Sequence, residues 1–567
     1  MKHASPNTPL LTAFLLPLLL VFPPLLVDAA AQAQSQAIFG AGSILQQIAP
    51  NKPALPSPSA TRLAIEREAG AGMPPGAPFW VERIEIGGNT LFETGPLHAL
   101  VASAEGTSLT LAQLDVQVGR ITDYYRSRGY FLARAIIPAQ AITAGIVRVQ
   151  VLEARYGQIR LDNSSRVRDS LLQDGLAALQ GGHMIEQAVL DHVLLLLSDL
   201  PGAVLNATLK PGAAVGSSDL LVQAGATAAV SGNIVFDNAG NDYTGRARLT
   251  ASANLIGALR QGDLLGVTAL STGHAMNYGR LAYEFALNGA GTRAGGARST
   301  LHYTLGGALA PLAAHGTAAV TSLWLRHPLL RTRDLNLHGQ VQFDRLQLGD
   351  HIDASALSVE RDLDNWSASL GGDARDKLFP GAITSWNLAA TAGRLGFDDA
   401  EAQASDAQTA RTEGRFLKWN ANLAHFQRLD ARTALHLALA GQWSNANLDA
   451  SGKMLAGGPS SVRGYDIAAL AGDLGYFGGV ELRRDLDLSW HGQWQGIAFI
   501  EHAHLTVNQT NWASGTNGAS LSGAGVGLNW YGVDQWSARL GIAAPAGATP
   551  PGINRKARAW LDIAKGF

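Results

Sequence analysis

Polar and apolar residues alternate in short segments from about residue 228 to the C-terminus. Residues 246–255 alternate at every position, residues 335–344 nearly do so, and residues 523–530 alternate small with apolar side chains. Segments of about ten alternating residues predict strands with one face toward lipid and the other toward a polar lumen. About 340 residues, at roughly 21 per strand and connection, therefore predict a transmembrane β-barrel of about 16 antiparallel strands.

Before residue 228, strand-like segments are interleaved with helical ones. In residues 79–154 the pattern predicts a strand, two helices and two strands, at residues 81–86, 96–104, 110–128, 132–137 and 146–152. Residues 155–227 repeat this order, at residues 157–161, 166–179, 184–197, 203–209 and 219–224. Two consecutive β-α-α-β-β units indicate an internal repeat at the level of topology, and hence two small α/β domains.

The first 33 residues have the pattern of an export signal. Lys2 and His3 precede an apolar stretch at residues 10–27, and the small residues at 29–33 offer A-x-A cleavage sites. An uncleaved membrane anchor is the alternative, but prolines interrupt the apolar run and small residues follow it directly. Beyond this signal no run of about 18 uncharged apolar residues occurs, so a membrane-embedded chain would have to cross as a barrel.

Two short regions connect the signal to the first domain. Residues 34–50 can form a short helix with its isoleucines and leucine roughly on one face. Residues 51–78 are rich in proline and predict an extended linker, with one helical patch at residues 62–68.

Composition narrows the class of protein further. Charged residues make up 16% of the chain, against about 25% in ordinary soluble proteins, which disfavours a large soluble β-sandwich or β-helix. Eleven of the twelve tryptophans follow residue 228, as expected of aromatic girdles at two membrane interfaces. The net charge of −2 gives no basic face for nucleic acid. The absence of cysteine excludes a thiolate metal site, a catalytic thiol and a disulfide.

Catalytic and cofactor-binding motifs are missing from the sequence. It contains no HExxH, GxxxxGK[ST] or G-x-S-x-G pattern, and the glycines at 523, 525 and 527 lack the βαβ context of a dinucleotide loop. His502 and His504 share one strand face, but without a third ligand in view we favour solvated histidines over a metal site. Some barrel enzymes use Ser and His without a local motif, and that alternative stays open. We predict neither an enzyme nor a bound cofactor.

The most informative motif lies late in the predicted barrel, within residues 457–482. At its centre stand Val462, Arg463, Gly464 and Tyr465. By themselves these residues would form a surface turn with a solvated arginine, but they lie between strand-like segments. The stretch resembles the signature lumenal loop of the two-partner secretion transporters, the TpsB type that includes haemolysin and filamentous-haemagglutinin transporters. These proteins share a superfamily of POTRA-bearing barrels with BamA.

The resemblance extends over nearly the whole chain. Family members have a signal peptide, a plug helix, a linker, two POTRA domains and a 16-stranded barrel, in the order found here. The resemblance implies a signal peptide at 1–33, a plug helix at 34–50, a linker at 51–78, POTRA domains at 79–154 and 155–227, and a barrel at 228–567.

Shorter matches support the same family. Residues 237–240 (Asp-Asn-Ala-Gly) resemble the family's first barrel strand and hairpin, and residues 472–475 (Gly-Asp-Leu-Gly), followed by Glu481, resemble the strand after the signature loop. The terminal Phe567 resembles the signal by which barrel precursors are recognised, although Lys565 breaks the apolar face of this last segment.

A second family motif, Phe-x-Asp-x-Gly on the inner barrel wall, has its counterpart at residues 499–503. These read Phe-Ile-Glu-His-Ala, and a period of two puts Phe499, Glu501 and Ala503 on one face. The resemblance implies that Glu501 replaces the family aspartate and pairs with Arg463. Glu for Asp keeps the carboxylate but adds one methylene, and Ala503 stands where the family has glycine.

The function implied by the resemblance is that of an outer-membrane pore for an unfolded secreted partner. The partner would be an adhesin or haemolysin-type exoprotein, recognised by the POTRA domains in the periplasm. Outer-membrane lipid and the barrel assembly machinery would be further partners, and nucleic acid would not. A BamA-type assembly factor is the alternative, disfavoured by the plug helix and Pro-rich linker. A passive porin or lipid-modifying barrel is disfavoured by the POTRA-like repeats.

Overall fold

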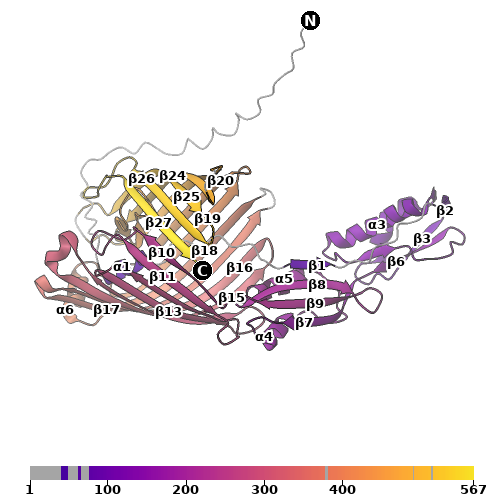
Figure 1. Ribbon diagram of the computed structural model, residues 1–567, viewed down its shortest axis with the longest axis horizontal. Coiled ribbons are helices and arrows are strands. Elements are labelled where there is room, and N and C mark those ends of the chain that lie inside the picture. Colours follow the sequence, from indigo (N-terminus) through magenta and orange to yellow (C-terminus); the bar gives the residue numbers. More distant parts are fainter. Residues whose placement is uncertain (1–39, 49–61, 66–75, 377–380, 489–490, 513–514) are drawn as a thin grey trace, which may run out of the picture.

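The computed structural model describes residues 40–48, 62–65, 76–376, 381–488, 491–512 and 515–567, and it contains a barrel with two α/β domains at one end (Figure 1). The predicted signal peptide at residues 1–33 and most of the predicted linker lie outside the described residues. Within the described ranges, no helix is long and apolar enough to span a membrane.

Sixteen antiparallel strands form the closed barrel, as predicted. They are β10 (Val230–Asp237), β11 (Arg248–Ile256), β12 (Leu264–Ser271), β13 (Met276–Ala286), β14 (Arg293–Thr304), β15 (Ala314–Arg331), β16 (Leu335–Ile352), β17 (Leu357–Asp376), β18 (Ala382–Phe397), β19 (Gly414–Arg428), β20 (Thr433–Ser444), β23 (Leu474–Leu486), β24 (Gln493–Thr506), β25 (Gly518–Tyr531), β26 (Trp536–Pro545) and β27 (Arg558–Gly566). Each strand pairs with its neighbour, and β10 pairs with β27 to close the ring.

Side chains alternate between the two faces of these strands. On β15 the odd-numbered Leu323 and Leu325 are exposed on the outside, whereas Trp324 turns inward and donates from Nε1 to Glu284 at 2.8 Å. This is the polar-in, apolar-out alternation that the sequence predicted. The strand β16 begins at Leu335 as expected but continues to Ile352, because its lumenal Leu346 and Leu348 pack inside the barrel.

The first α/β domain contains β2 (Phe79–Val81), β3 (Arg83–Gly87), α2 (Thr94–Val101), β4 (Thr107–Leu109), α3 (Leu111–Ser127), β5 (Arg134–Ile136) and β6 (Ile146–Leu152), with a 3-10 turn at Ala102–Ala104. Thr110 caps α3, forming a capping box with Gln113. The single strand predicted at residues 81–86 is instead interrupted at Glu82. The amides of Glu82 and Arg83 both donate to the carbonyl of Gly145, which diverts the chain there.

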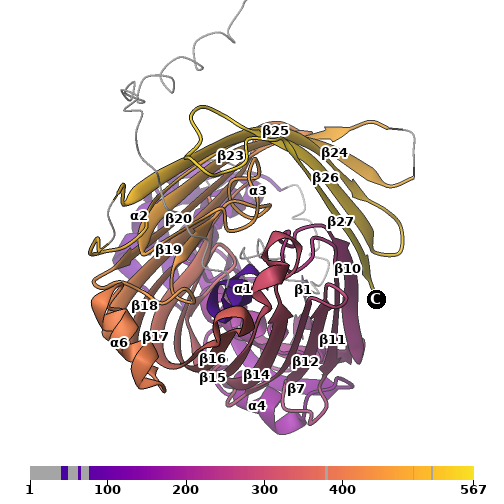
Figure 2. The same ribbon diagram turned by 90° about the vertical axis from the view of Figure 1, so that its left-hand side faces the viewer.

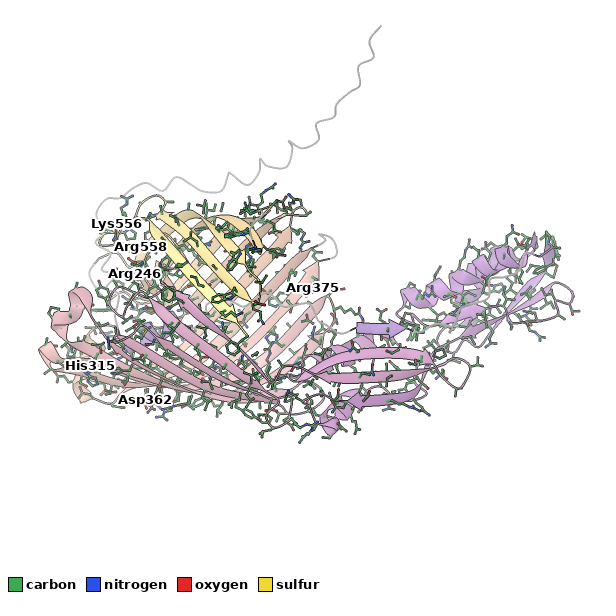
Figure 3. The ribbon with its side chains drawn as sticks, viewed as in Figure 1. Arg246, His315, Asp362, Arg375, Lys556 and Arg558 are labelled. Carbon is green, nitrogen blue, oxygen red and sulfur yellow. The ribbon has the colours of Figure 1, made fainter. Side chains whose placement is uncertain are left out.

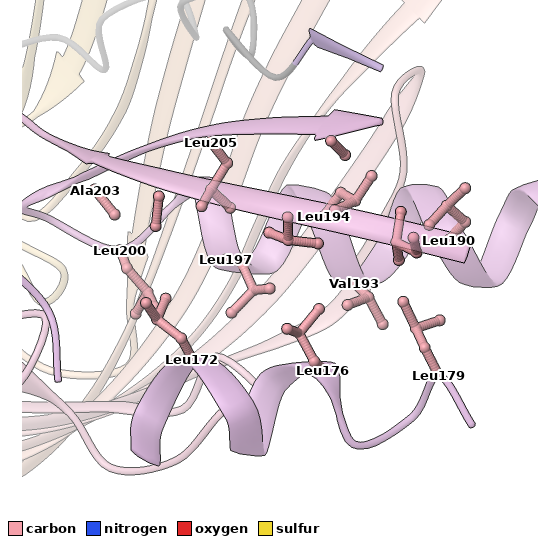
Figure 4. Close-up of a cluster of buried hydrophobic side chains, with 14 of the residues drawn as sticks. Leu172, Leu176, Leu179, Leu190, Val193, Leu194, Leu197, Leu200, Ala203 and Leu205 are labelled. Atoms are coloured by element: carbon pink, nitrogen blue, oxygen red, sulfur yellow. The ribbon is translucent and has the colours of Figure 1, made fainter. Parts of the chain in front are cut away.

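The second domain contains β7 (Arg155–Asn163), α4 (Asp169–Leu176), α5 (Gln187–Ser198), β8 (Ala203–Pro211) and β9 (Ser217–Ala226). Leucines of α4 and α5 pack under the sheet, as Figure 4 shows for Leu172 and Leu194 beside Leu205 of β8. Both helices are shorter than predicted. Residues 184–186 pair with the start of β7 instead, since the Ile185 amide donates to the Ala154 carbonyl.

The helical patch predicted at residues 62–68 is wrong where it can be compared. Arg62–Ile65 form a strand, β1, that pairs in parallel with β8 at the edge of the second domain's sheet. Leu63 packs against the core of that domain. A helix of seven residues is marginal without tertiary support, whereas the open edge of β8 offers unpaired N–H and C=O groups.

A short helix, α1 (Ala41–Ile48), lies inside the barrel ring (Figure 2). Ala41 and Ile44 are fully buried and pack with Tyr303, Leu346 and Leu348 of the barrel wall. The helix therefore occupies the lumen, where the predicted plug helix is expected.

Candidate functional site in the barrel lumen

The signature residues lie on a long loop, residues 445–473, that connects β20 to β23 and contains a small hairpin of β21 (Met454–Ala456) and β22 (Leu470–Gly472). Val462 and Tyr465 at its tip are fully buried. Gly464 touches the barrel wall, since a Cβ there would lie 2.8 Å from the backbone of Ala544. The loop therefore folds back into the barrel, with its tip against the wall.

Arg463 is held by two wall carboxylates. Its Nε lies 2.7 Å from Oε1 of Glu501, and its Nη1 lies 2.8 Å from Oε2 of Glu481. The backbone amide of Arg463 also donates to Oε2 of Glu501 at 2.8 Å. The guanidinium stacks over Phe499, 3.3 Å from the ring centroid. The structure thus brings together Arg463, Phe499 and Glu501, the three residues that the sequence placed in one cluster.

Glu481 on β23 is the partner that sequence reasoning missed. It pairs with Arg463 and also with Arg483, whose Nε lies 2.7 Å from Oε1 of Glu481. Glu481 stands directly across the ladder from Phe499, so both side chains share the lumenal face. Counting alternate residues along β23 would have placed Glu481 on the lumenal face, once the pairing of β23 with β24 was known.

The loop backbone is fixed at further points around the tip. Trp560 of β27 donates from Nε1 to the carbonyl of Arg463 at 2.7 Å. Asp466 pairs with Arg558 and, at 3.5 Å, with Arg246. Figure 3 labels both arginines at the end of the barrel farther from the α/β domains. These contacts tie the loop tip to β27 and to the connection between β10 and β11.

The base of the loop has its own buried ion pair. Nζ of Lys453 lies 2.6 Å from Oδ1 of Asp473, whose side chain is fully buried. Asp473 also accepts hydrogen bonds from the amides of Leu448 and Gln509, at 3.1 and 2.8 Å. This aspartate belongs to the Gly-Asp-Leu-Gly stretch, and it joins the loop to the next outer loop.

Asp237, in the stretch that resembles the first barrel strand, helps to hold α1. It pairs with Arg248 at 2.8 Å, and Nη1 of Arg248 donates to the carbonyl of Gln47 at 3.3 Å. Asn241 donates to the side-chain oxygen of Gln47 at 2.9 Å. A cation near the C-terminal carbonyls of a helix is favourable, so this contact stabilises the helix end.

Phe567 lies at the seam between β27 and β10. Its amide and carbonyl exchange hydrogen bonds with those of Gly232, both at 3.0 Å. A Cβ at Gly232 would lie 2.5 Å from the phenyl ring, so glycine is needed for this packing. Lys565 turns back at the barrel rim, where its amine donates to the carbonyl of Asp534.

His502 and His504 lie on the outer face of β24, opposite in direction to Glu501. Each has a serine neighbour, since His502 Nδ1 lies 2.8 Å from Ser522 Oγ and His504 Nδ1 lies 2.8 Å from Ser520 Oγ. Among the described residues, no three His, Asp or Glu side chains are grouped so as to hold a metal ion.

Comparisons with known proteins agree with this arrangement. The profile of the family described as haemolysin secretion/activation protein ShlB/FhaC/HecB matches residues 216–530, and that of the ShlB-type POTRA domain matches residues 79–154. The heme/hemopexin transporter protein HuxB of Haemophilus influenzae (strain 86-028NP) is 27% identical over 479 residues, which cover 84% of each chain. The outer membrane transporter CdiB of Dickeya dadantii (strain 3937) is 23% identical over 79% of this chain and 80% of that protein.

Solved structures share the fold. CdiB from Escherichia coli superposes with a TM-score of 0.67 at 20% identity, covering 88% of this chain and 93% of that one. CdiB from Acinetobacter baumannii gives 0.61 at 16% identity, covering 91% and 95%. The family profile matches more than half of the sequence. The chain therefore belongs to the haemolysin secretion/activation family of ShlB, FhaC and HecB, whose outer-membrane barrels with periplasmic POTRA domains export a partner protein by two-partner secretion.

Proposed function

We propose that the transporter captures an unfolded exoprotein, of adhesin or haemolysin type, on the sheet edges of its POTRA domains. An unfolded chain can add a strand at such an edge, gaining main-chain hydrogen bonds with little demand on its sequence. In the described part of POTRA 1, the sheet order β3-β6-β5 leaves β3 and β5 as edges. The side chain of Arg134 on β5 is exposed, so this edge is accessible.

The POTRA 2 sheet offers less room. Its order is β1-β8-β9-β7, so β1 from the linker already covers β8, and β7 is the opposite edge. A client strand that paired with β8 would have to replace β1. We therefore assign first contact to POTRA 1.

One observation carries the proposed route into the barrel, a cavity of about 740 Å³ between POTRA 2 and the periplasmic ends of the barrel strands. Leu194 and Leu195 of α5 line it on one side, and Arg326 and Arg375 of the barrel on the other. Figure 3 labels Arg375 at the end of the barrel that faces the POTRA domains. A client leaving the POTRA sheets would meet this cavity before the lumen.

The proposed mechanism requires no catalysis. The periplasm supplies no nucleotide, so client binding and folding outside the cell must provide the driving force. We also propose that Phe567, which directly follows β27 and bonds to Gly232 at the seam, is read by the barrel assembly machinery during insertion.

Site-directed cross-linking tests the proposed capture step. The chain has no cysteine, so Arg134→Cys places a single thiol on the β5 edge, and Asp115→Cys places one on the exposed face of α3 as a matched control. A thiol cross-linker should join Arg134→Cys, and not Asp115→Cys, to the unfolded secretion domain of an exoprotein that the transporter secretes. Equal labelling of both positions, or none, would contradict recognition at this edge.

A further inference from the structure

A second buried arginine lies in the lumen, away from the signature tip. Arg361 on β17 has a side chain that is 7% exposed. Its Nη2 lies 2.8 Å from Oδ2 of Asp350 on β16, and its Nε lies 2.7 Å from Oδ2 of Asp449 in the long loop. One guanidinium therefore joins the barrel wall to the base of the loop.

Asp350 uses its other oxygen to hold the plug helix. Oδ1 accepts the amide of Ala41, the first residue of α1, at 2.7 Å, and the hydroxyl of Tyr303 at 2.5 Å. A carboxylate at the N-terminus of a helix satisfies a free N–H group and is favoured by the helix dipole. The position of the helix thus depends on Asp350, and the charge of Asp350 is neutralised by Arg361.

Asp449 anchors the loop in the way that Asp350 anchors the plug. Its Oδ1 accepts both the amide and the hydroxyl of Ser451, at 2.8 and 2.5 Å. Ser451 packs directly against the plug, because a Cβ on Gly42 would lie 2.7 Å from the Ser451 nitrogen. Gln46 of the plug donates to the carbonyl of Ala450 at 3.2 Å. The loop base and the helix are therefore in contact, and each is anchored to the same arginine.

We infer that Arg361 is a shared positioning residue that makes plug release and loop movement one coupled event. If either carboxylate moves away, the guanidinium loses one of the two contacts that fix its position, and the other carboxylate then no longer has a rigidly held partner. A loosened loop should then also loosen the plug, although Asp449 acts on the plug only through Arg361 and Ser451. The conductance measurements do not depend on the proposed transport function. Only the secretion measurement rests on it.

The test measures the single-channel conductance of the full-length chain in planar bilayers, where the pore passes ions once the plug has left the lumen. Asp449→Asn alters only the loop anchor, yet it should raise the open probability by about tenfold, within the range usual for coupled sites. In an Arg361→Gln background the same substitution should have no further effect. An unchanged open probability for Asp449→Asn, or an equal increase in both backgrounds, would overturn the inference.

Two further variants test the specificity of the effect. Arg345→Gln breaks an ion pair with Asp362 on the outer face, where the arginine is half exposed, and should leave conductance unchanged. Arg361→Lys keeps the charge but cannot reach both carboxylates as a fork, so it should give an intermediate open probability. A wild-type value for Arg361→Lys would contradict the shared-fork geometry.

Oxidative cross-linking supplies a readout that needs no client. In the cysteine-free chain, Gly42→Cys with Ser451→Cys brings two Cβ atoms to 2.8 Å, so plug and loop must separate by about 1 Å before a disulfide of ordinary geometry forms. Because plug and loop move together in the inferred event, joining them should leave the raised open probability of Asp449→Asn unchanged. A channel that closes on complete cross-linking would show that the plug leaves without the loop, and would overturn the inference. Normal coupling with failed secretion would instead count against the proposed client route.

Discussion

At the scale of single residues, the lumen concentrates buried charge around two arginines, each with two carboxylates. Arg463 lies between Glu481 and Glu501, and Arg361 lies between Asp350 and Asp449. A buried cation with two anionic partners tolerates the loss of one partner better than an isolated pair does. The arginine itself is the sensitive member, because its removal leaves two carboxylates facing each other.

Arg463→Ala should reduce secretion strongly while the barrel still inserts. The substitution removes the arginine from Glu501 while Glu481 keeps Arg483, and breaking a buried pair costs about 3–5 kcal/mol. Glu501→Ala should be less severe, since Glu481 stays paired with Arg463, and Glu501→Asp should be mild. Secreted partner per inserted transporter is the quantity to measure. Wild-type secretion by Arg463→Ala with normal insertion would refute the role of the loop tip.

Glu153 should make POTRA 1 sensitive to acid. Burial acts to raise the pKa of its carboxyl, but hydrogen bonds from Thr90, Leu91 and Tyr125 outweigh burial and hold the pKa below the usual 4.5. A lowered pKa in the folded state means that the stabilisation is complete above pH 4.5 and is lost as the pH falls below it.

Hydrogen exchange of residues 79–154 in the full-length chain measures this effect. Glu153→Gln should unfold more readily than wild type at neutral pH, by about 1–3 kcal/mol for the disrupted buried hydrogen bonds. The difference should shrink as the pH falls below 4.5. A difference that stays constant from neutral pH down to pH 3 would show that the charge of Glu153 has no part in it.

Much of the Arg463 site could be predicted from the sequence, because the loop motif and the wall motif each lie within a few residues. Period two then places Phe499 and Glu501 on one face. The Arg361 cluster could not be predicted in this way. Its carboxylates come from β16 and from the loop, and they meet only because the plug and the loop enter the same lumen.

At the scale of elements, the start of α3 and the period of the barrel strands were predictable, whereas the starts of α4 and α5 and the pairing partner of β1 were not. The capping box at Thr110 fixes the start of α3 locally, so the sequence suffices there. The β1 strand depends on the distant edge of β8, with Leu63 opposite Ala207, so no local pattern identifies it. Barrel strands also extend beyond the segments in which polar and apolar residues alternate. The lumenal residues next to α1 include leucines, and these interrupt the alternation.

Deletion of residues 34–50 should raise ion conductance in planar bilayers and leave secretion largely intact. The described helix within this segment packs against the lumenal wall and should act in gating. A chain carrying the Arg345→Gln substitution and an intact plug provides the control. Lost secretion with unchanged conductance would mean that the segment serves another purpose.

At the scale of the whole molecule, ion pairs and a hydrogen bond join POTRA 2 to two turns of the barrel. Arg331 holds both oxygens of Asp199, at 2.7 and 2.8 Å, and Arg333 reaches Asp191 at 2.6 Å. The amide of Gly289 donates to Asp174 at 2.5 Å. These contacts come from two different turns of the barrel, and they fix POTRA 2 relative to the lumen.

The closed ring predicts heat-modifiable migration on gels. Without heating, the hydrogen-bonded barrel should stay folded in mild detergent and migrate faster than the boiled chain, and its circular dichroism spectrum should be rich in strand. Protease should meanwhile trim the smaller POTRA domains first. A single migration position with a helix-rich spectrum would be incompatible with the barrel.

The sixteen strands differ widely in length, and this has a consequence for the surrounding lipid. β17 has 20 residues and β16 has 18, whereas β10 and β12 have only 8 each. A tilted strand needs about 9–11 residues to cross the hydrocarbon layer. Lipids beside the closing seam therefore meet a shorter wall than lipids on the opposite side. Hydrophobic mismatch should thin the outer membrane locally there, so that the transporter sits in a bilayer of uneven thickness.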